Sequence, residues 1–219
     1  MAIGSADAIV PEGAETYVPP KPRIALDHVL RIQGYRDMAR VRADVRSVAI
    51  AMTRVAEELA APVAAFRTVP VDACDDGSLS LGTGARFTGS AFAPILSDCR
   101  DVIPFVLTLG EAIDTKVMAL LESGEIVEAL FLETAGWLGI EQATRALSRH
   151  LQKRAKAHGL CLTRRLGPGY KEWDLEEQRI LFGLFSDTEL PVRLLDSCAM
   201  LPKKSRSGLY GLRPLGPKP

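Results

Sequence analysis

Apolar residues recur every three or four positions over two long stretches of the chain, a spacing that predicts two principal helices. The first covers residues 37–60. Its apolar stripe comprises Val41, Val45, Val48, Met52, Val55 and Leu59. The second covers residues 125–157, and its first half, from Ile126 to Trp137, is apolar nearly all round. This second helix is therefore predicted to be central and buried. Two glycines within it, Gly136 and Gly139, indicate either close backbone packing or a ligand lying against the helix.

Shorter helices and several strands fill the rest of the predicted fold. Helices are expected at residues 27–32, 90–99, 111–121 and 175–185. Alternating or continuous apolar runs predict strands at residues 63–69, 78–81, 101–108, 160–165 and 192–195. The first two strands are expected to form a hairpin, and Pro104 favours an edge or bulge position for the third. The pattern predicts an α+β fold, with helices packed on a mostly antiparallel, twisted sheet.

The chain of 219 residues is long enough for one domain with a substantial core. Residues 1–22 contain many prolines and small residues and predict a flexible or extended N-terminal arm. Residues 23–212 are predicted to form a single domain, and the proline-rich residues 213–219 a frayed tail.

Composition excludes several classes of function. The 27 basic and 27 acidic residues balance, which argues against binding to nucleic acid through phosphate contacts. No apolar run approaches the roughly 18 residues of a membrane span, and the N-terminus lacks the features of a secretory signal. We therefore expect a cytoplasmic protein that has no membrane partner and whose four cysteines are reduced.

Familiar catalytic motifs do not occur in the chain. The cysteines lie far apart, there is no HExxH, GxSxG or GxxxxGK[ST], and only three histidines are present. His150 and His158 fall in a basic helical stretch and are interpreted as solvated surface. The sequence thus predicts no catalytic side chain, among the thiols or elsewhere, and no metal site.

Two segments carry the candidate chemistry. The first is RLGPGY, residues 165–170, in which two glycines flank a proline directly after a strand. The planar guanidinium of Arg165 can bind a carboxylate, and the ring of Tyr170 can pack against a flat group. The alternative interpretation of this segment is a purely structural turn. Residues 196–211 are rich in serine, lysine and arginine and are interpreted as a loop, either a binding loop or a solvated surface loop.

Together these segments resemble the AdoMet-binding activation, or reactivation, domain of cobalamin-dependent methionine synthase. That family shows an arginine followed after two residues by Pro-Gly-Tyr, then a helix, then a stretch of the form S-x-A-M-x-P-x-x-S-x-S-G-x-Y. Here the corresponding residues run from Arg165 to Tyr170 and from Ser197 to Tyr210. The resemblance covers residues 125–211 well and the first 120 residues in outline. The sequence GYKEWDLEEQ resembles short stand-alone relatives more than it resembles the fused domain.

The resemblance implies an α+β activation-domain fold and a role in repairing oxidised cobalamin. In the family, an electron from a flavodoxin-type donor and a methyl group from AdoMet restore the methylated cofactor. The nucleophile is cobalt, so the protein mainly positions the reactants. The cofactors implied are S-adenosyl-L-methionine and a cobalamin carried by a partner protein. The implied partners are a cobalamin-binding methionine synthase chain and a flavodoxin- or ferredoxin-type reductant, with the other catalytic modules on separate chains.

The resemblance also assigns roles to individual residues. The expected AdoMet-binding residues are Arg165, Gly167, Pro168, Gly169, Tyr170 and Glu141. The expected cobalamin- or partner-facing residues are Ser197, Met200, Lys204, Ser205, Ser207, Gly208 and Tyr210. Lys203, Lys204 and Arg206 are expected to form a basic rim for docking. Glu141 has the alternative of being an ordinary boundary residue of its helix.

Two features depart from the family pattern. No residue matches the early acidic group that holds the amino group of AdoMet, and Lys171 to Asp174 replace a Cys-Pro-Asp-His run. The leading hypothesis is a free-standing reactivation subunit of a split methionine synthase. The alternatives are a non-enzymatic activation or docking factor for another corrinoid-dependent methyltransferase or demethylase, and an AdoMet-binding regulatory module.

Overall fold

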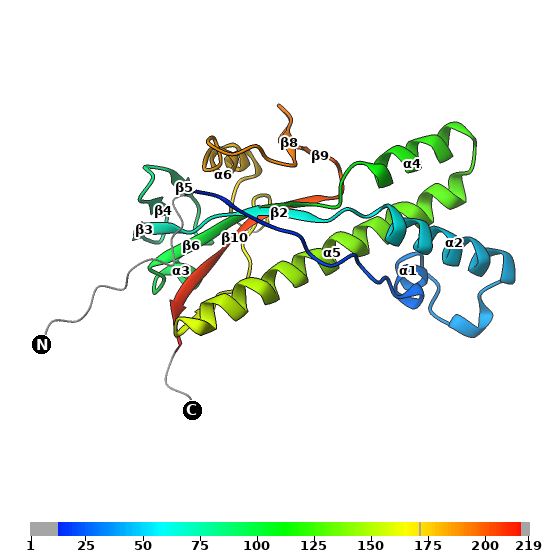
Figure 1. The fold of residues 1–219 in the computed structure, drawn as a ribbon, viewed down its shortest axis with the longest axis horizontal. Coiled ribbons are helices and arrows are strands. Elements are labelled where there is room, and N and C mark those ends of the chain that lie inside the picture. Colours follow the sequence, from blue (N-terminus) through cyan, green and yellow to red (C-terminus); the bar gives the residue numbers. More distant parts are fainter. Residues whose placement is uncertain (1–12, 171, 216–219) are drawn as a thin grey trace, which may run out of the picture.

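An eight-stranded antiparallel sheet forms the centre of the computed structural model, which describes residues 13–170 and 172–215 (Figure 1). Its strands are β1 (Glu15–Tyr17), β2 (Val63–Phe66), β3 (Val69–Cys74), β4 (Ser78–Leu81), β5 (Arg86–Thr88), β6 (Asp101–Thr108), β7 (Leu160–Leu162) and β10 (Ser205–Pro214). They follow the order β1-β2-β6-β3-β4-β5, and β10 pairs with both β6 and β7. A separate two-stranded ribbon joins β8 (Arg193–Leu194) to β9 (Met200–Leu201).

Helices cover both faces of the sheet. They are α1 (Leu26–Ile32), η1 (Met38–Arg40), α2 (Ala43–Leu59), α3 (Ala93–Leu96), α4 (Ala112–Glu122), α5 (Ile126–Ala157), η2 (Leu175–Glu177) and α6 (Gln178–Gly183). Figure 1 shows the long helix α5 running along one face and continuing beyond the sheet, where α1, α2 and α4 surround it. Within the described residues, no helix combines the length and apolarity needed to cross a bilayer.

Strand β6 holds the two hydrophobic cores together. Phe105 and Leu107 point into the core beneath α5, whereas Val102 and Val106 point into the core shared with α3 and α6. Because both faces of β6 are buried, its sequence is continuously apolar instead of alternating. The predicted strand at residues 101–108 is confirmed with the same bounds.

Pro104 lies within this inner strand and not at the edge that its residue type suggested. On the β10 side its neighbour Leu209 exchanges both backbone hydrogen bonds, each 2.9 Å long, with Leu166 and so turns away from Pro104. On the other side Pro104 faces the junction between β2 and β3, where its carbonyl accepts from the Arg67 amide at 3.2 Å. The missing N–H of the proline therefore falls where the backbone hydrogen bonds between β6 and its neighbouring strands are interrupted.

Helix α5 has the predicted position and nearly the predicted bounds, but its first half is not buried all round. Ile126, Leu130 and Trp137 are at least half exposed, because neighbouring elements cover only one side of this part of the helix. Close backbone packing explains its two glycines. A Cβ atom would lie 2.8 Å from Lys204 Cε at Gly136 and 3.0 Å from Leu109 Cδ1 at Gly139.

Other predicted segments are divided or paired differently. The helix expected at residues 37–60 begins as the short η1 turn, and the strand expected at 63–69 divides into β2 and β3. Strand β4 pairs with β3, so the expected hairpin forms without β2. The segment 196–211, expected as a loop, contains β9 and most of β10.

Part of the expected N-terminal arm belongs to the sheet. Residues 1–12 lie outside the described residues, but β1 pairs with β2, Tyr17 stacks on His150 at 4.1 Å, and Glu15 forms a 2.6 Å ion pair with Arg154. His150 is therefore packed against β1 and is not solvated surface, whereas His158 is exposed as expected. At the other end, β10 extends to Pro214, so the expected tail at 213–219 begins as strand.

Candidate functional site

The RLGPGY segment is held against β10 by backbone hydrogen bonds. Leu166 and Leu209 each donate to the other at 2.9 Å, immediately before the turn that ends at Tyr170. Gly167 leaves room for the Arg165 side chain, because a Cβ there would lie 2.8 Å from Arg165 Nη1. Gly169 has φ +80°, the left-handed conformation that glycine adopts without strain. The glycines thus shape a turn that presents Arg165 and Tyr170 on the same side.

Arg165 is a half-buried cation that has no acidic partner in the part of the chain that the structure describes. Its guanidinium lies 5.8 Å from the centre of the Tyr170 ring and donates a long 3.4 Å hydrogen bond to the Ser207 carbonyl. Among the described residues, no carboxylate lies within ion-pair distance of it. Burial, and then the charge of Arg206, lower the pKa of Arg165 from its usual value. This environment favours an incoming anion such as a carboxylate.

A cavity of about 160 Å³ opens beside this guanidinium. Its lining joins α5, the RLGPGY turn, the start of α6 and the β9–β10 segment. The lining residues are Trp137, Ile140, Arg165, Pro168, Tyr170, Gln178, Met200, Lys203, Lys204, Ser205, Arg206 and Ser207. Small-molecule sites usually enclose about 300–1,000 Å³, so this cavity has room for only part of a nucleoside-sized molecule.

Most of the residues predicted from the two sequence segments meet in this cavity. Sequence reasoning missed Trp137, Ile140 and Gln178. The buried Gln178 accepts from Ser207 Oγ and donates to the Cys198 carbonyl, both at 3.0 Å, so it connects the two segments. Nothing in the local sequence marks these residues: Trp137 ends an apolar stretch that predicts burial, and Gln178 is an ordinary polar residue of a short helix.

Glu141 lies on α5, next in sequence to the cavity-lining Ile140, and is bound by two arginines. Its Oε2 accepts from Arg206, and its Oε1 accepts from Arg145 Nε at 3.2 Å. Burial alone would raise the pKa of Glu141, but the hydrogen bonds and charges of Arg206 and Arg145 bring that pKa below its usual value. Glu141 itself lines a separate, larger groove of about 660 Å³ between α5 and residues 20–28.

Several residues expected to face a partner are buried. Tyr210 is only 3% exposed and stacks on Phe105 with ring centres 5.4 Å apart. Gly208 is buried where β10 meets Leu166, and a Cβ there would lie 2.3 Å from the Leu166 carbonyl oxygen. Tyr210 and Gly208 therefore lie inside the sheet and not at an exposed surface, because β10 is an inner strand. Ser207 is also buried but lines the cavity, and of the other expected residues only Ser197 is exposed.

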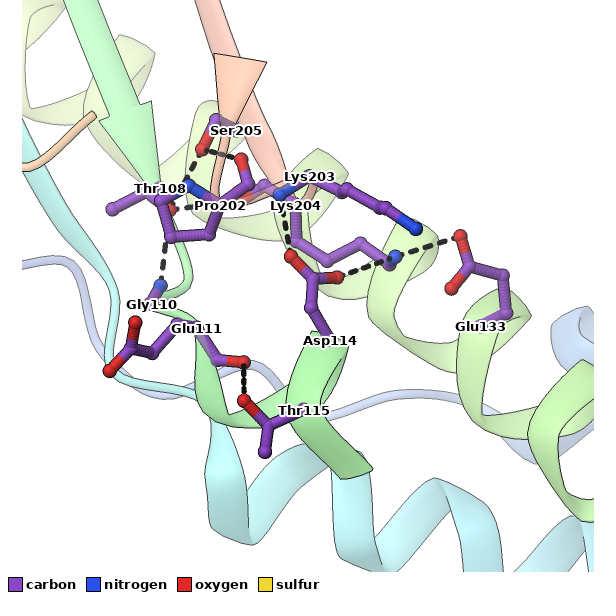
Figure 2. Close-up of polar contacts among 10 residues, drawn as sticks. All are labelled: Thr108, Gly110, Glu111, Asp114, Thr115, Glu133, Pro202, Lys203, Lys204 and Ser205. Atoms are coloured by element: carbon purple, nitrogen blue, oxygen red, sulfur yellow. Dashed lines mark hydrogen bonds and ion pairs between the residues drawn. The ribbon is translucent and has the colours of Figure 1, made fainter. Parts of the chain in front are cut away.

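The turn into β10 is held by a buried lysine, as Figure 2 shows. Lys204 is 3% exposed, and its Nζ lies 2.8 Å from Glu133 and 3.2 Å from Asp114. The Asp114 carboxylate also accepts from the Lys203 amide at 2.5 Å. One lysine thus fastens the turn to both α4 and α5.

Ser205 fixes the same turn from the side of the sheet. Its hydroxyl bonds to Thr108 Oγ1 at 2.9 Å and donates to the Pro202 carbonyl at 2.6 Å (Figure 2). The expected basic rim is therefore reduced to Lys203, because Lys204 and Arg206 are held in internal ion pairs.

The four cysteines are free thiols, and none lines the cavity. Burial raises the pKa of the Cys99 thiol to about 12, which keeps that sulfur protonated and unreactive. In residues 13–170 and 172–215 no group of three His, Cys, Asp or Glu side chains is arranged to hold a metal ion.

Comparison with known proteins was informative at the level of structure. No family model matches the sequence. No curated protein matches it significantly either. A solved structure described as the MetH reactivation domain bound to AdoHcy is similar with a TM-score of 0.59 and 14% sequence identity, covering 94% of this chain and 80% of that one. The predicted α+β class is confirmed, and the chain has the fold of the MetH reactivation domain.

Proposed function

We propose that this chain binds AdoMet and its demethylated product AdoHcy in the cavity beside Arg165. The observation that carries this proposal is the half-buried Arg165 guanidinium, which stacks beside Tyr170 and lacks an acidic partner among the described residues. The carboxylate of the amino-acid portion would pair with Arg165. The small cavity suits that portion, and the adenosine would extend to the surface.

The wider role proposed is that of a reactivation subunit of a split cobalamin-dependent methionine synthase. The fold and the two sequence motifs support this role together. Tyr170 is 65% exposed and Trp137 is also largely exposed at the mouth of the cavity, where flat aromatic faces suit a corrin ring carried by a partner chain. When bound, that cobalamin supplies the cobalt that takes the methyl group, and this chain positions AdoMet.

Binding of AdoHcy tests the first proposal directly. We expect the purified chain to bind AdoHcy without added metal, and Arg165→Ala to weaken binding by about 1.5–3 kcal/mol, the usual size for a lost charged hydrogen bond. Arg164→Ala is the matched control, because Arg164 is adjacent but exposed. Calorimetry that detects no binding by the folded parent protein would remove the AdoMet assignment.

A growth experiment tests the wider role. Deletion of the gene should abolish growth without methionine if the chain serves methionine synthase. Unimpaired growth would instead favour activation of another corrinoid-dependent methyltransferase or a regulatory role.

A further inference from the structure

Helix α4 and the first half of α5 form an antiparallel hairpin that extends beyond the sheet (Figure 1). The buried Lys204 ammonium lies 3.2 Å from an Asp114 carboxylate oxygen of α4 and 2.8 Å from a Glu133 carboxylate oxygen of α5 (Figure 2). Because one ammonium group reaches both carboxylates, Asp114 and Glu133 lie on the same side of the hairpin. They show which side chains of the two helices lie next to each other between this point and the hairpin tip.

Two short rows of apolar side chains run along this side of the hairpin. On α4, Met118 and Leu121 follow the aspartate at intervals of four and three residues, and on α5, Leu130 and Ile126 precede the glutamate at intervals of three and four. Residues with this spacing share one face of a helix. The four side chains are between 46% and 65% exposed, so no other element of the described chain covers them. We call these four residues the hairpin face.

The surroundings of the hairpin face are acidic. Residues 111–133 contain six acidic residues and one lysine. Glu122, Glu125 and Glu128, which flank the hairpin tip, form no ion pair with any described residue. Charge complementarity therefore favours a basic partner. The same carboxylates would repel the hairpin face of a second copy and an anionic lipid surface.

The arrangement of the two rows suits a helix. Two antiparallel helices leave a seam between them, and a third helix fills such a seam with apolar residues at intervals of about three and four. The row on α5 also continues toward the candidate site, because Trp137 follows Glu133 by four residues and is 55% exposed where it lines the cavity. A helix that covers the hairpin face therefore lies close to the cavity mouth.

We infer that the hairpin face is the docking site for a basic amphipathic helix of a partner protein. The apolar side of that helix would cover Met118, Leu121, Ile126 and Leu130, and its lysines or arginines would meet the carboxylates at the hairpin tip. This inference goes beyond the proposed function and does not depend on ligand binding beside Arg165.

Two synthetic peptides of about 18 residues serve as probes. One is an amphipathic helix of leucine and lysine, and the other has glutamate in place of every lysine. Fluorescence anisotropy of the labelled peptides should show that the parent chain binds the lysine peptide at least about tenfold more tightly than the glutamate peptide. Equal affinities, or no binding of the lysine peptide, would overturn the inference.

Matched variants locate the binding on the hairpin face. Leu130→Ser should weaken binding of the lysine peptide about fivefold, because a half-exposed leucine loses its apolar contact. Leu215→Ser is the control, since Leu215 is 48% exposed but lies beside Gly159, past the other end of α5. Glu125→Gln should weaken binding about twofold, whereas Glu189→Gln, which removes another exposed carboxylate, should not. Equal effects in a variant and its control would contradict the location.

Sedimentation and vesicle binding decide between this partner and the other occupants. The parent chain should be monomeric and should not bind vesicles of phosphatidylcholine and phosphatidylserine. A dimer that Leu130→Ser dissociates would replace the inference with self-association, and vesicle binding that Leu130→Ser abolishes would replace it with a membrane. The AdoHcy titration is separate: its failure removes the proposed function alone, and failure of peptide binding removes this inference alone.

Discussion

The buried cation Lys204 allows a stability prediction to be worked out from its surroundings. Lys204→Met keeps a straight apolar chain in the space over Gly136 but removes the charge between Asp114 and Glu133. Breaking a buried ion pair by removing one partner costs about 3–5 kcal/mol. Glu133 is 48% exposed and can be rehydrated, whereas Asp114 is 15% exposed and keeps the Lys203 amide. We therefore expect a loss of about 2–4 kcal/mol in the free energy of unfolding.

Urea unfolding measures this loss, with unchanged m values showing that the denatured state is comparable. Lys203→Met is the control, because it removes an adjacent exposed charge and should shift stability by less than about 0.5 kcal/mol. Glu133→Gln should cost less than about 1 kcal/mol, since its side chain is half exposed. Combining Lys204→Met with Asp114→Asn should cost less than the sum of the single changes. A Lys204→Met protein as stable as the Lys203→Met control would refute the reasoning.

Two further predictions concern β10 and β1. Gly208→Ala should lower the free energy of unfolding by about 2–4 kcal/mol, because its Cβ would meet the Leu166 carbonyl oxygen at 2.3 Å. Gly84→Ala is the control and should cost clearly less, because Gly84 has φ +83° but no atom within 4 Å of the added Cβ. Equal losses in urea unfolding would contradict this prediction. Burial, and then the charge of Arg154, lower the pKa of His150 below its usual 6.5, so the folded state favours neutral imidazole and stability should fall as pH drops below about 6.5. In His150→Gln the fall in the urea midpoint between pH 7.5 and 5.5 should become shallower, and an unchanged slope would show that other groups cause it.

Local sequence patterns predicted the elements whose formation depends on nearby residues. The bounds of α5 and β6 follow from apolar spacing and from a continuous apolar run, which neighbouring positions specify. The turn at RLGPGY was equally readable, because glycine and proline restrict the backbone directly. These same local motifs led to the fold that structural comparison confirms.

Sequence alone therefore determined the fold class, the main helix and the two segments that meet at the candidate site. Only the tertiary structure decided that residues 205–214 form an inner strand, since the polar run Lys203 to Ser207 resembles a loop until its partners are known. Those partners lie far away in sequence. Asp114 and Glu133 form ion pairs with Lys204, Thr108 forms a hydrogen bond with Ser205, and Glu141 forms an ion pair with Arg206. Burial of polar side chains depends on such distant compensating groups, and local spacing carries no information about them.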